Sequence, residues 1–275
     1  MKKALSILLS VLLIASLAGC AAETPPPSGD DDAAAPVEII VFAAASMKET
    51  ITEIVELYKD VAPNVTVTAT FESSGTLKTQ IEEGALCDIF ISAAQRQMNQ
   101  LDITKDEAVN PDRLDFVMEG TRINLLENKV ALVVPEGNEG NITSFADIAG
   151  CRLIAIGNSD VPVGSYSLEI FDFIGLDVAA MEAAGQITYG GNVKEVTTQV
   201  AEATCDCGIV YATDAFSAGL EVVDTATLEM CAQVIYPAAL IKDSTAPEAA
   251  QAFLNYLGSA DAIAVFEAVG FSYVG

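Results

Sequence analysis

The chain has 275 residues, and its 39 acidic against 13 basic side chains give it a formal net charge of −26. A charge of this sign repels nucleic acid and anionic lipid headgroups, so neither is an expected binding partner. The chain also contains no histidine. This excludes Ser-His-Asp and Cys-His catalytic arrangements and removes the commonest zinc ligand.

Residues 1–20 predict a secretory signal with a lipidation site. Two lysines precede an apolar run over residues 4–17, which is too short for a membrane-spanning helix. Residues 17–20 read Leu-Ala-Gly-Cys and resemble the bacterial lipobox, in which the cysteine receives a diacylglycerol after cleavage. We therefore expect export across the cytoplasmic membrane. The lipid on Cys20 should then hold the protein on the outer face of that membrane and be its only membrane contact.

Residues 21–36 consist mainly of Ala, Pro, Ser, Gly and Asp and predict a disordered spacer. Behind it, about 240 residues remain, enough for one large or two ordinary domains. Apolar runs and segments of helical spacing alternate there, which predicts an α/β protein with two mainly parallel sheets flanked by helices. A change of register near residue 128 favours two lobes, one of residues 37–127 and 236–275 and the other of residues 128–235.

The pattern predicts strands and helices in the following order. The predicted strands are residues 37–43, 64–71, 87–92, 130–135, 152–156, 208–211 and 232–241. The predicted helices are residues 46–58, 74–84, 94–101, 144–148, 162–174, 192–203, 247–257 and 260–268.

Four turns share one feature: a predicted strand runs into a predicted helix through a lead rich in Ser, Asn or Gly. They lie at Ser46, Ser74, Val163 and Val193. A helix amino terminus offers unpaired N–H groups and a partial positive charge, so it binds an oxyanion without a cationic side chain. An acidic chain that binds an anion needs such neutral donors. The serine hydroxyls, and Tyr211 at a strand end, can add donors, although a lone serine there is more often a plain cap and a lone tyrosine more often a packing residue. Ser46 is predicted to cap its helix, because Glu49 completes a capping box.

Five cysteines follow Cys20: Cys87, Cys151, Cys205, Cys207 and Cys231. Their number is odd and no Cys-x-x-Cys spacing repeats, so no disulfide framework is predicted. We expect them to be buried as small apolar residues.

Five segments together resemble the molybdate-binding proteins of ABC importers in order and spacing. They read VFAAASMKE at 41–49, FESSGTLKTQIEEGALCDIFISA at 71–93, VPVGSYS at 161–167, GGNVKEV at 190–196 and GIVYATDA at 208–215. The resemblance spans residues 37–275 and implies the two-lobed periplasmic-binding-protein fold of type II, with the ligand cleft between the lobes. It also implies a solute-binding lipoprotein, expected to be a monomer, that captures molybdate and tungstate and delivers them to an ABC importer permease. Neither an enzymatic activity, a cofactor nor a bare metal cation is expected, because molybdenum is bound as the oxyanion.

The resemblance also implies which residues surround the anion. Carried over position by position, they are Ser46, Ser74, Val163, Val193 and Tyr211. The two serines would present donors from one lobe and the other three residues from the second lobe. This chain departs from the family at two of these turns, with valine at 163 where alanine is frequent and Gly75 where a further serine is common. The backbone N–H survives the first change, whereas the second removes a hydroxyl beside Ser74.

Three alternatives remain open. The first is the same fold with another solute, such as sulfate, an amino acid or a ferric ion. An amino-acid site would need an arginine for the carboxylate, and the arginines lie away from the helix starts: Arg96, Arg113, Arg122 and Arg152. The second is a serine hydrolase with Lys48 or Lys78 as the base, although no S-x-x-K or G-x-S-x-G motif occurs. The third is a structural surface lipoprotein without a ligand.

Overall fold

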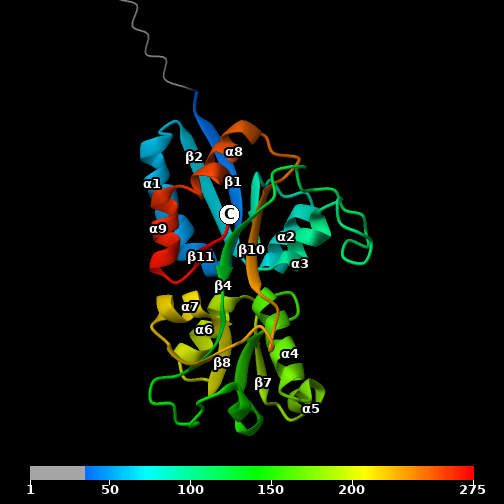
Figure 1. Ribbon diagram of the computed structural model, residues 1–275, viewed down its shortest axis with the longest axis vertical. Coiled ribbons are helices and arrows are strands. Elements are labelled where there is room, and N and C mark those ends of the chain that lie inside the picture. The colour runs from blue at the N-terminus through cyan, green and yellow to red at the C-terminus, as the bar shows by residue number, and fades with distance from the viewer. Residues whose placement is uncertain (1–34) are drawn as a thin grey trace, which may run out of the picture. The chain divides into compact units, whose positions relative to one another are not determined.

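The computed structural model describes residues 35–275, which form one compact unit. It contains two β-sheets, one of six strands in the order β11-β4-β10-β3-β1-β2 and one of five in the order β7-β6-β8-β5-β9. Helices flank both sheets, as Figure 1 shows, and we call the two parts lobe 1 and lobe 2 in that order. The predicted signal peptide, Cys20 and almost all of the predicted spacer lie outside the described residues. Within residues 35–275, no helix is both long and apolar enough to span a membrane.

Lobe 1 is built around β1, whose sequence VEIIVFAA is apolar and whose last four residues are buried. This strand lies between β2 and β3 and runs parallel to both, so the carboxyl ends of all three meet at one edge. The strands are β1 (Val37–Ala44), β2 (Val65–Glu72), β3 (Ile89–Ile91), β4 (Ile123–Asn128), β10 (Val234–Leu240) and β11 (Ser272–Tyr273). The helices are η1 (Ala45–Met47), α1 (Lys48–Val61), α2 (Ser74–Glu82), α3 (Gln95–Leu101), α8 (Pro247–Tyr256) and α9 (Ala260–Ala268).

Lobe 2 has a similar plan. Its strand β6 lies between β7 and β8 and runs parallel to both, while β5, with the sequence VALVV, is buried throughout. The strands are β5 (Val130–Val134), β6 (Ile154–Gly157), β7 (Ile187–Gly190), β8 (Cys207–Tyr211) and β9 (Glu221–Thr225). The helices are η2 (Phe145–Gly150), α4 (Pro162–Phe173), α5 (Val178–Ala183), α6 (Val193–Ala201) and α7 (Ala212–Ala218).

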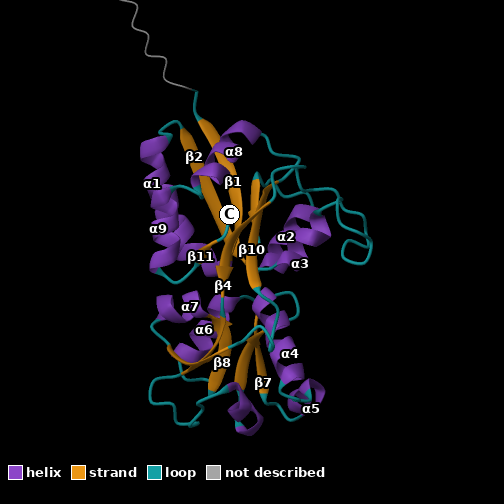
Figure 2. Ribbon diagram, in the orientation of Figure 1, coloured by secondary structure: helices purple, strands orange, loops and turns teal. Residues whose placement is uncertain are grey.

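Each sheet is mixed rather than mainly parallel. In lobe 1, β10 runs antiparallel to β3 and β4, and β11 antiparallel to β4. In lobe 2, β5 runs antiparallel to β8 and β9. The reason is the path of the chain, which leaves lobe 1 through β4 into β5 and returns through β9 into β10, so the returning strands run against their neighbours. Figure 2 shows β4 and β10 of the lobe 1 sheet reaching toward lobe 2.

The apolar core continues from one lobe into the other. One cluster of buried side chains includes Ile39 and Ile51 of lobe 1 together with Leu132 and Ile156 of lobe 2. The five cysteines of the described residues are buried and free, which confirms the prediction that they are buried. Because the cluster of buried side chains is continuous, the two lobes are in direct contact.

Candidate functional site

A small cavity lies where the carboxyl ends of the lobe 1 strands meet the helix starts of lobe 2. Ligands of α/β proteins collect at such strand ends. The cavity volume is only about 10 Å³ for the centre of a water-sized sphere, which is about the space that one water molecule needs. Its lining is uncharged except for one carboxylate residue. The lining residues are Ala44, Ala45, Ser46, Glu72, Ser73, Ser74 and Ala93 of lobe 1 and Val161, Pro162, Val193 and Tyr211 of lobe 2.

Ser46 lies two residues after the end of β1 and is 5% exposed. The predicted capping box is wrong, because the cap residue of α1 is Met47, which makes no side-chain cap hydrogen bond. The 3-10 turn η1 is inserted between β1 and α1 and places Ser46 ahead of the cap position. Its Oγ instead lies 2.9 Å from the hydroxyl oxygen of Tyr236 on β10.

Ser74 is the first residue of α2, and Ser73 caps that helix by accepting the N–H of Thr76 at 3.1 Å. The two adjacent serines therefore have different tasks. Ser74 is fully buried, and its Oγ accepts the backbone N–H of Ala93 at 2.9 Å. Since a backbone N–H can only donate, the hydroxyl proton of Ser74 remains free for a guest.

Two helices of lobe 2 begin at the cavity. Helix α6 begins with Val193, and Asn192 caps it with its side chain. Helix α4 begins with Pro162, so Val163 is its second residue. Val163 is fully buried and does not line the cavity, whereas Val161 and Pro162 do. The first N–H groups of a helix have no acceptor within it, so the amides of Val163 and Val193 are donors that a guest could use.

Tyr211 is the last residue of β8 and is 1% exposed. Burial raises the pKa of Tyr211 well above its ordinary value, so the phenol keeps its proton and acts as a donor. Its hydroxyl donates across the lobes to the carbonyl oxygen of Ala93 at 3.5 Å. A bond of this length is weak, so the proton can turn to a better acceptor at little cost.

Lys194 joins the two lobes beside the cavity. Its ammonium nitrogen lies 2.8 Å from Glu49 of α1 and 3.0 Å from Asp214 of α7. Burial raises the pKa of Asp214 to about 6, although Lys194 opposes this shift. Burial would lower the pKa of Lys194, but the carboxylates of Asp214 and Glu49 outweigh it and raise that pKa. The ammonium is thus held by two carboxylates and does not line the cavity.

Two further contacts close the lobes around the cavity. Asn192 of lobe 2 donates to Glu72 of lobe 1 at 3.3 Å. The start of α2 presses against the loop before α4, because a Cβ added to Gly75 would lie only 2.3 Å from the carbonyl oxygen of Asp160. A serine at position 75 would therefore hold the lobes apart. The absence of a side chain at Gly75 allows close contact here.

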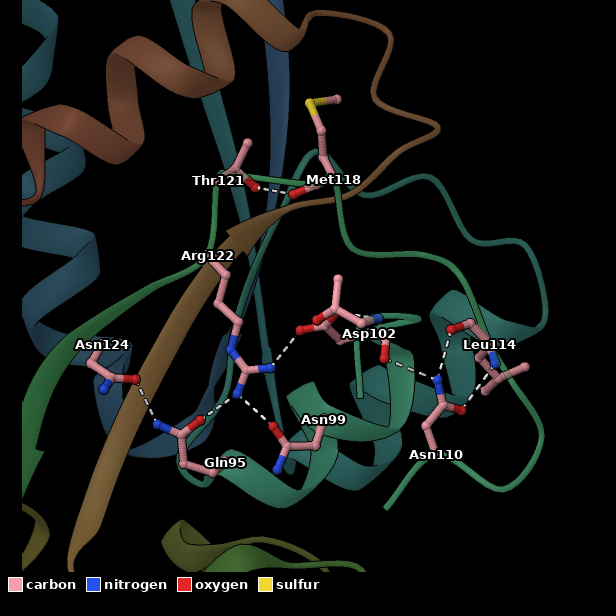
Figure 3. A network of polar contacts seen from close by, with 10 residues as sticks. Gln95, Asn99, Asp102, Asn110, Leu114, Met118, Thr121, Arg122 and Asn124 are labelled. Carbon is pink, nitrogen blue, oxygen red and sulfur yellow. Dashed lines mark hydrogen bonds and ion pairs between the residues drawn. The ribbon is translucent and has the colours of Figure 1, made fainter. Parts of the chain in front are cut away.

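The arginines make contacts elsewhere. Figure 3 shows Arg122 at the centre of a network in lobe 1, where its guanidinium donates to Asp102 at 2.7 Å, to Asn99 at 2.6 Å and to Gln95. These contacts attach both ends of α3 to the residue before β4. Arg96 donates to Ser165 of lobe 2 at 3.4 Å, outside the cavity lining. No arginine is among the lining residues, so the expected partner of an amino-acid carboxylate is not among them.

Within the described part of the chain, the hydrolase alternative lacks its residues, and so does a metal site made of His, Cys, Asp and Glu. Lys78 pairs with Glu82 at 2.6 Å, and Lys48 is exposed on α1. In the part of the chain that the structure describes, the hydroxyls of Ser46 and Ser74 bond to a tyrosine and a backbone amide instead of a lysine. Across residues 35–275, no three His, Cys, Asp or Glu residues are arranged to hold a metal ion.

A larger cavity, of about 300 Å³, lies where the chain crosses between the lobes, among residues 127–130 and 225–234. No helix begins in these segments, so the convergent N–H groups of the smaller cavity have no counterpart there. The smaller cavity is therefore the better candidate for an anion.

Three residues of the site were not singled out from the sequence. Tyr236 contacts Ser46 from a strand 190 positions away, and Asn128 contacts Tyr236 in turn at 3.2 Å. Glu72 lines the cavity as the last residue of β2. Its place directly before the two serines was a local signal that an acidic side chain would lie at the cavity, whereas no local signal marks the other two.

The sequence matches a known family over most of its length. The family described as bacterial extracellular solute-binding protein matches residues 39–272. A putative ABC transporter substrate-binding lipoprotein of Bacillus subtilis is 32% identical over 242 residues, which cover 86% of this chain and 86% of that protein. The molybdate-binding protein of Escherichia coli is 30% identical over 243 residues, which cover 86% of this chain and 89% of the relative.

Solved structures share the fold. The periplasmic molybdate-binding protein of Azotobacter vinelandii has a TM-score of 0.72 at 21% identity, covering 86% of this chain and 100% of its own. The sulfate-binding protein of Mycobacterium tuberculosis has a TM-score of 0.68 at 17% identity, covering 86% and 87%. These likenesses confirm the two-lobed periplasmic-binding-protein fold. Since the family match spans nearly all of the described residues, the chain belongs to the bacterial extracellular solute-binding protein family.

Proposed function

We propose that this protein captures molybdate, and tungstate with it, between its lobes and delivers the oxyanion to the permease of an ABC importer. One observation carries the proposal: neutral hydrogen-bond donors from both lobes converge on one small cavity. The names of the relatives from Escherichia coli and Bacillus subtilis support the ligand and the transporter respectively.

The proposed ligands of the oxyanion are Ser46, Ser74, Val163, Val193 and Tyr211. A dianion loses a large hydration energy when it enters a cavity, so its oxygens need short N–H or O–H partners. Each charge-assisted hydrogen bond contributes about 1.5–3 kcal/mol net. Hydroxyls from lobe 1 and amides from the helix starts of lobe 2 supply such partners without a cation. Binding to both lobes at once would favour the closed form, which the permease would recognise.

We further propose that the mature protein is a monomer anchored through Cys20 after residues 1–20 are removed. The Bacillus subtilis relative is named as a lipoprotein, which supports this anchoring. For the lobes we propose the boundaries predicted from the sequence, residues 37–127 with 236–275 and residues 128–235. The hinge would then lie where β4 continues into β5 and where β10 begins.

Sulfate is the second candidate ligand. It is also a tetrahedral dianion, and the same uncharged lining residues would face it. The sulfate-binding protein of Mycobacterium tuberculosis shares the fold, although its identity of 17% supports nothing beyond the fold. Selection between the two ions would depend on the size of the cavity, because neither ion carries a proton near neutral pH.

Titration calorimetry of a soluble form, residues 21–275, tests the proposal. We expect strong binding of molybdate and tungstate and weak binding of sulfate and phosphate. Equal binding of sulfate and molybdate would overturn the choice of ligand. Absence of heat with all four oxyanions would contradict an oxyanion site altogether.

A further inference from the structure

The hydroxyl of Tyr236 lies behind the cavity and contacts two polar side chains. Tyr236 is a fully buried residue of β10. Its hydroxyl oxygen lies 2.9 Å from Ser46 Oγ and 3.2 Å from Asn128 Nδ2. Ser46 lines the cavity, whereas neither Tyr236 nor Asn128 does. The three residues form a chain of hydrogen bonds that leads from the hinge to the cavity.

Asn128 is held in one orientation. It is the last residue of β4, and its Oδ1 accepts the backbone N–H of Lys129 at 2.8 Å. Its Nδ2 therefore faces the other way, toward Tyr236 and toward Thr213 Oγ1 of lobe 2 at 2.9 Å. An amide nitrogen only donates hydrogen bonds. Consequently the hydroxyl oxygen of Tyr236 is an acceptor in its contact with Asn128.

The single proton of Tyr236 must then point to Ser46. If Ser46 donated to Tyr236 instead, the phenol proton would have no acceptor among the contacts of the described residues. A buried donor without a partner costs about 1–3 kcal/mol, so this arrangement is disfavoured. Burial also keeps the pKa of Tyr236 well above its ordinary value, so the proton is always present. Ser46 Oγ therefore accepts from Tyr236, and its own proton is available to the cavity.

We propose that Tyr236 and Asn128 are positioning residues, which direct the hydroxyl proton of Ser46 into the cavity and thereby favour oxyanions that carry no proton of their own. The proposal deepens the oxyanion site proposed above and rests on it. Ser74 is oriented in the same way by the N–H of Ala93, so both serines meet the guest as donors. An anion such as hydrogen phosphate brings an O–H group of its own, and a serine that accepted it in place of donating would leave its own buried proton without an acceptor.

The Tyr236→Phe variant tests this directly, because it removes the hydroxyl and keeps the ring that packs against Tyr211 and Phe271. Calorimetry at mildly alkaline pH would measure molybdate, sulfate and hydrogen phosphate on the parent and the variant. Sulfate and hydrogen phosphate are close in size. The ratio of their dissociation constants therefore depends on the proton that only hydrogen phosphate carries. Glu72 also lines the cavity, but it is present in both proteins and cancels from the comparison.

In the variant, the bond from Tyr236 no longer fixes the Ser46 hydroxyl, which can then turn either its proton or a lone pair to the guest. We expect the preference for sulfate and molybdate over hydrogen phosphate to fall about tenfold. The Asn128→Asp variant should move the ratio in the same direction, because the introduced carboxylate accepts the proton of Tyr236 and leaves Ser46 to donate to the phenol. Tyr58→Phe is the matched control, since Tyr58 is a buried tyrosine of α1 that packs on Phe253 and Tyr256, away from the cavity lining. It should leave the ratio unchanged.

An unchanged ratio in Tyr236→Phe, with all anions weakened equally or not at all, would overturn the positioning role. The parent protein in the same series reports separately on the proposed function. If it prefers sulfate to molybdate, the ligand proposed above is wrong, while the change in the ratio still tests Tyr236. A parent that binds none of the three anions overturns both proposals.

Discussion

On the lobe 1 side of the cavity the candidate donors are side chains, the hydroxyls of Ser46 and Ser74. On the lobe 2 side, the candidate donors at Val163 and Val193 are backbone N–H groups at the starts of α4 and α6, joined by the hydroxyl of Tyr211. The two sides follow from different local structures. In lobe 1 a serine stands beside each strand end, whereas in lobe 2 the helix starts carry valines whose side chains belong to the core.

The difference decides how each side responds to mutation. A hydroxyl disappears with its side chain, so substitution by alanine removes a donor from lobe 1. A backbone N–H survives every substitution except proline. An alanine scan would therefore detect the serines and Tyr211 and miss the amides, and the contribution of lobe 2 would be underestimated.

The largest effect is expected from the serines of lobe 1. Replacing Ser74 with alanine removes a donor to the guest and leaves the Ala93 N–H without its acceptor. We expect Ser46→Ala and Ser74→Ala each to weaken molybdate binding by about 1.5–3 kcal/mol, which is roughly tenfold or more. The neighbouring Ser73→Ala variant loses a helix cap and should mainly lower the free energy of unfolding, by about 1 kcal/mol. Calorimetry and thermal unfolding separate these outcomes, and a greater loss of binding in Ser73→Ala would reverse the assignment.

A smaller effect is expected in lobe 2 and needs a pair of variants. Val193→Pro removes the N–H at the first position of α6, where proline is tolerated. The extended backbone of Asn192, with φ −153° and ψ 172°, suits a residue that precedes proline. We expect this variant to bind molybdate about tenfold more weakly. Val193→Ala keeps the N–H and should bind like the parent while losing stability from the core. Equal binding by both variants would show that this amide is not a ligand.

The sequence predicted the strands that have a continuous apolar run or a clean alternation, and it missed β4, β7, β9 and β11. The strands predicted at residues 37–43, 130–135 and 208–211 correspond to β1, β5 and β8, in which apolar runs are buried. No strand was predicted at β7 or β9, which form the two edges of the lobe 2 sheet. Both are partly exposed and carry polar residues, so neither a continuous apolar run nor a clean alternation marks them.

The site divides in the same way into local and long-range parts. The turns at Ser74 and Val193 could be predicted, because a helix start leaves a local pattern in the sequence. The direction of the Ser46 hydroxyl depends on Tyr236, which is 190 positions away, and no spacing rule connects the two. The contact of Gly75 with Asp160 likewise depends on how the lobes meet. Local patterns thus located the candidate donors, and tertiary structure determines which way they point.

The smallest expected effect concerns Glu72, the only charged residue of the lining, which stands on the hydroxyl side. Its carboxylate accepts from Asn192 of lobe 2 at 3.3 Å, and it also repels an anionic guest. Glu72→Gln keeps an oxygen for Asn192 and removes the charge. We expect molybdate binding to strengthen by about threefold at low ionic strength and by less at high salt, because the repulsion is screened. Glu53→Gln on the exposed face of α1 makes the same change of charge away from the lining and should have no effect. If Glu72→Gln instead weakens molybdate binding, the hydrogen bond from Asn192 to the charged carboxylate favours binding more than the repulsion of the anion opposes it. The role of the Glu72 carboxylate would then be to hold the two lobes together.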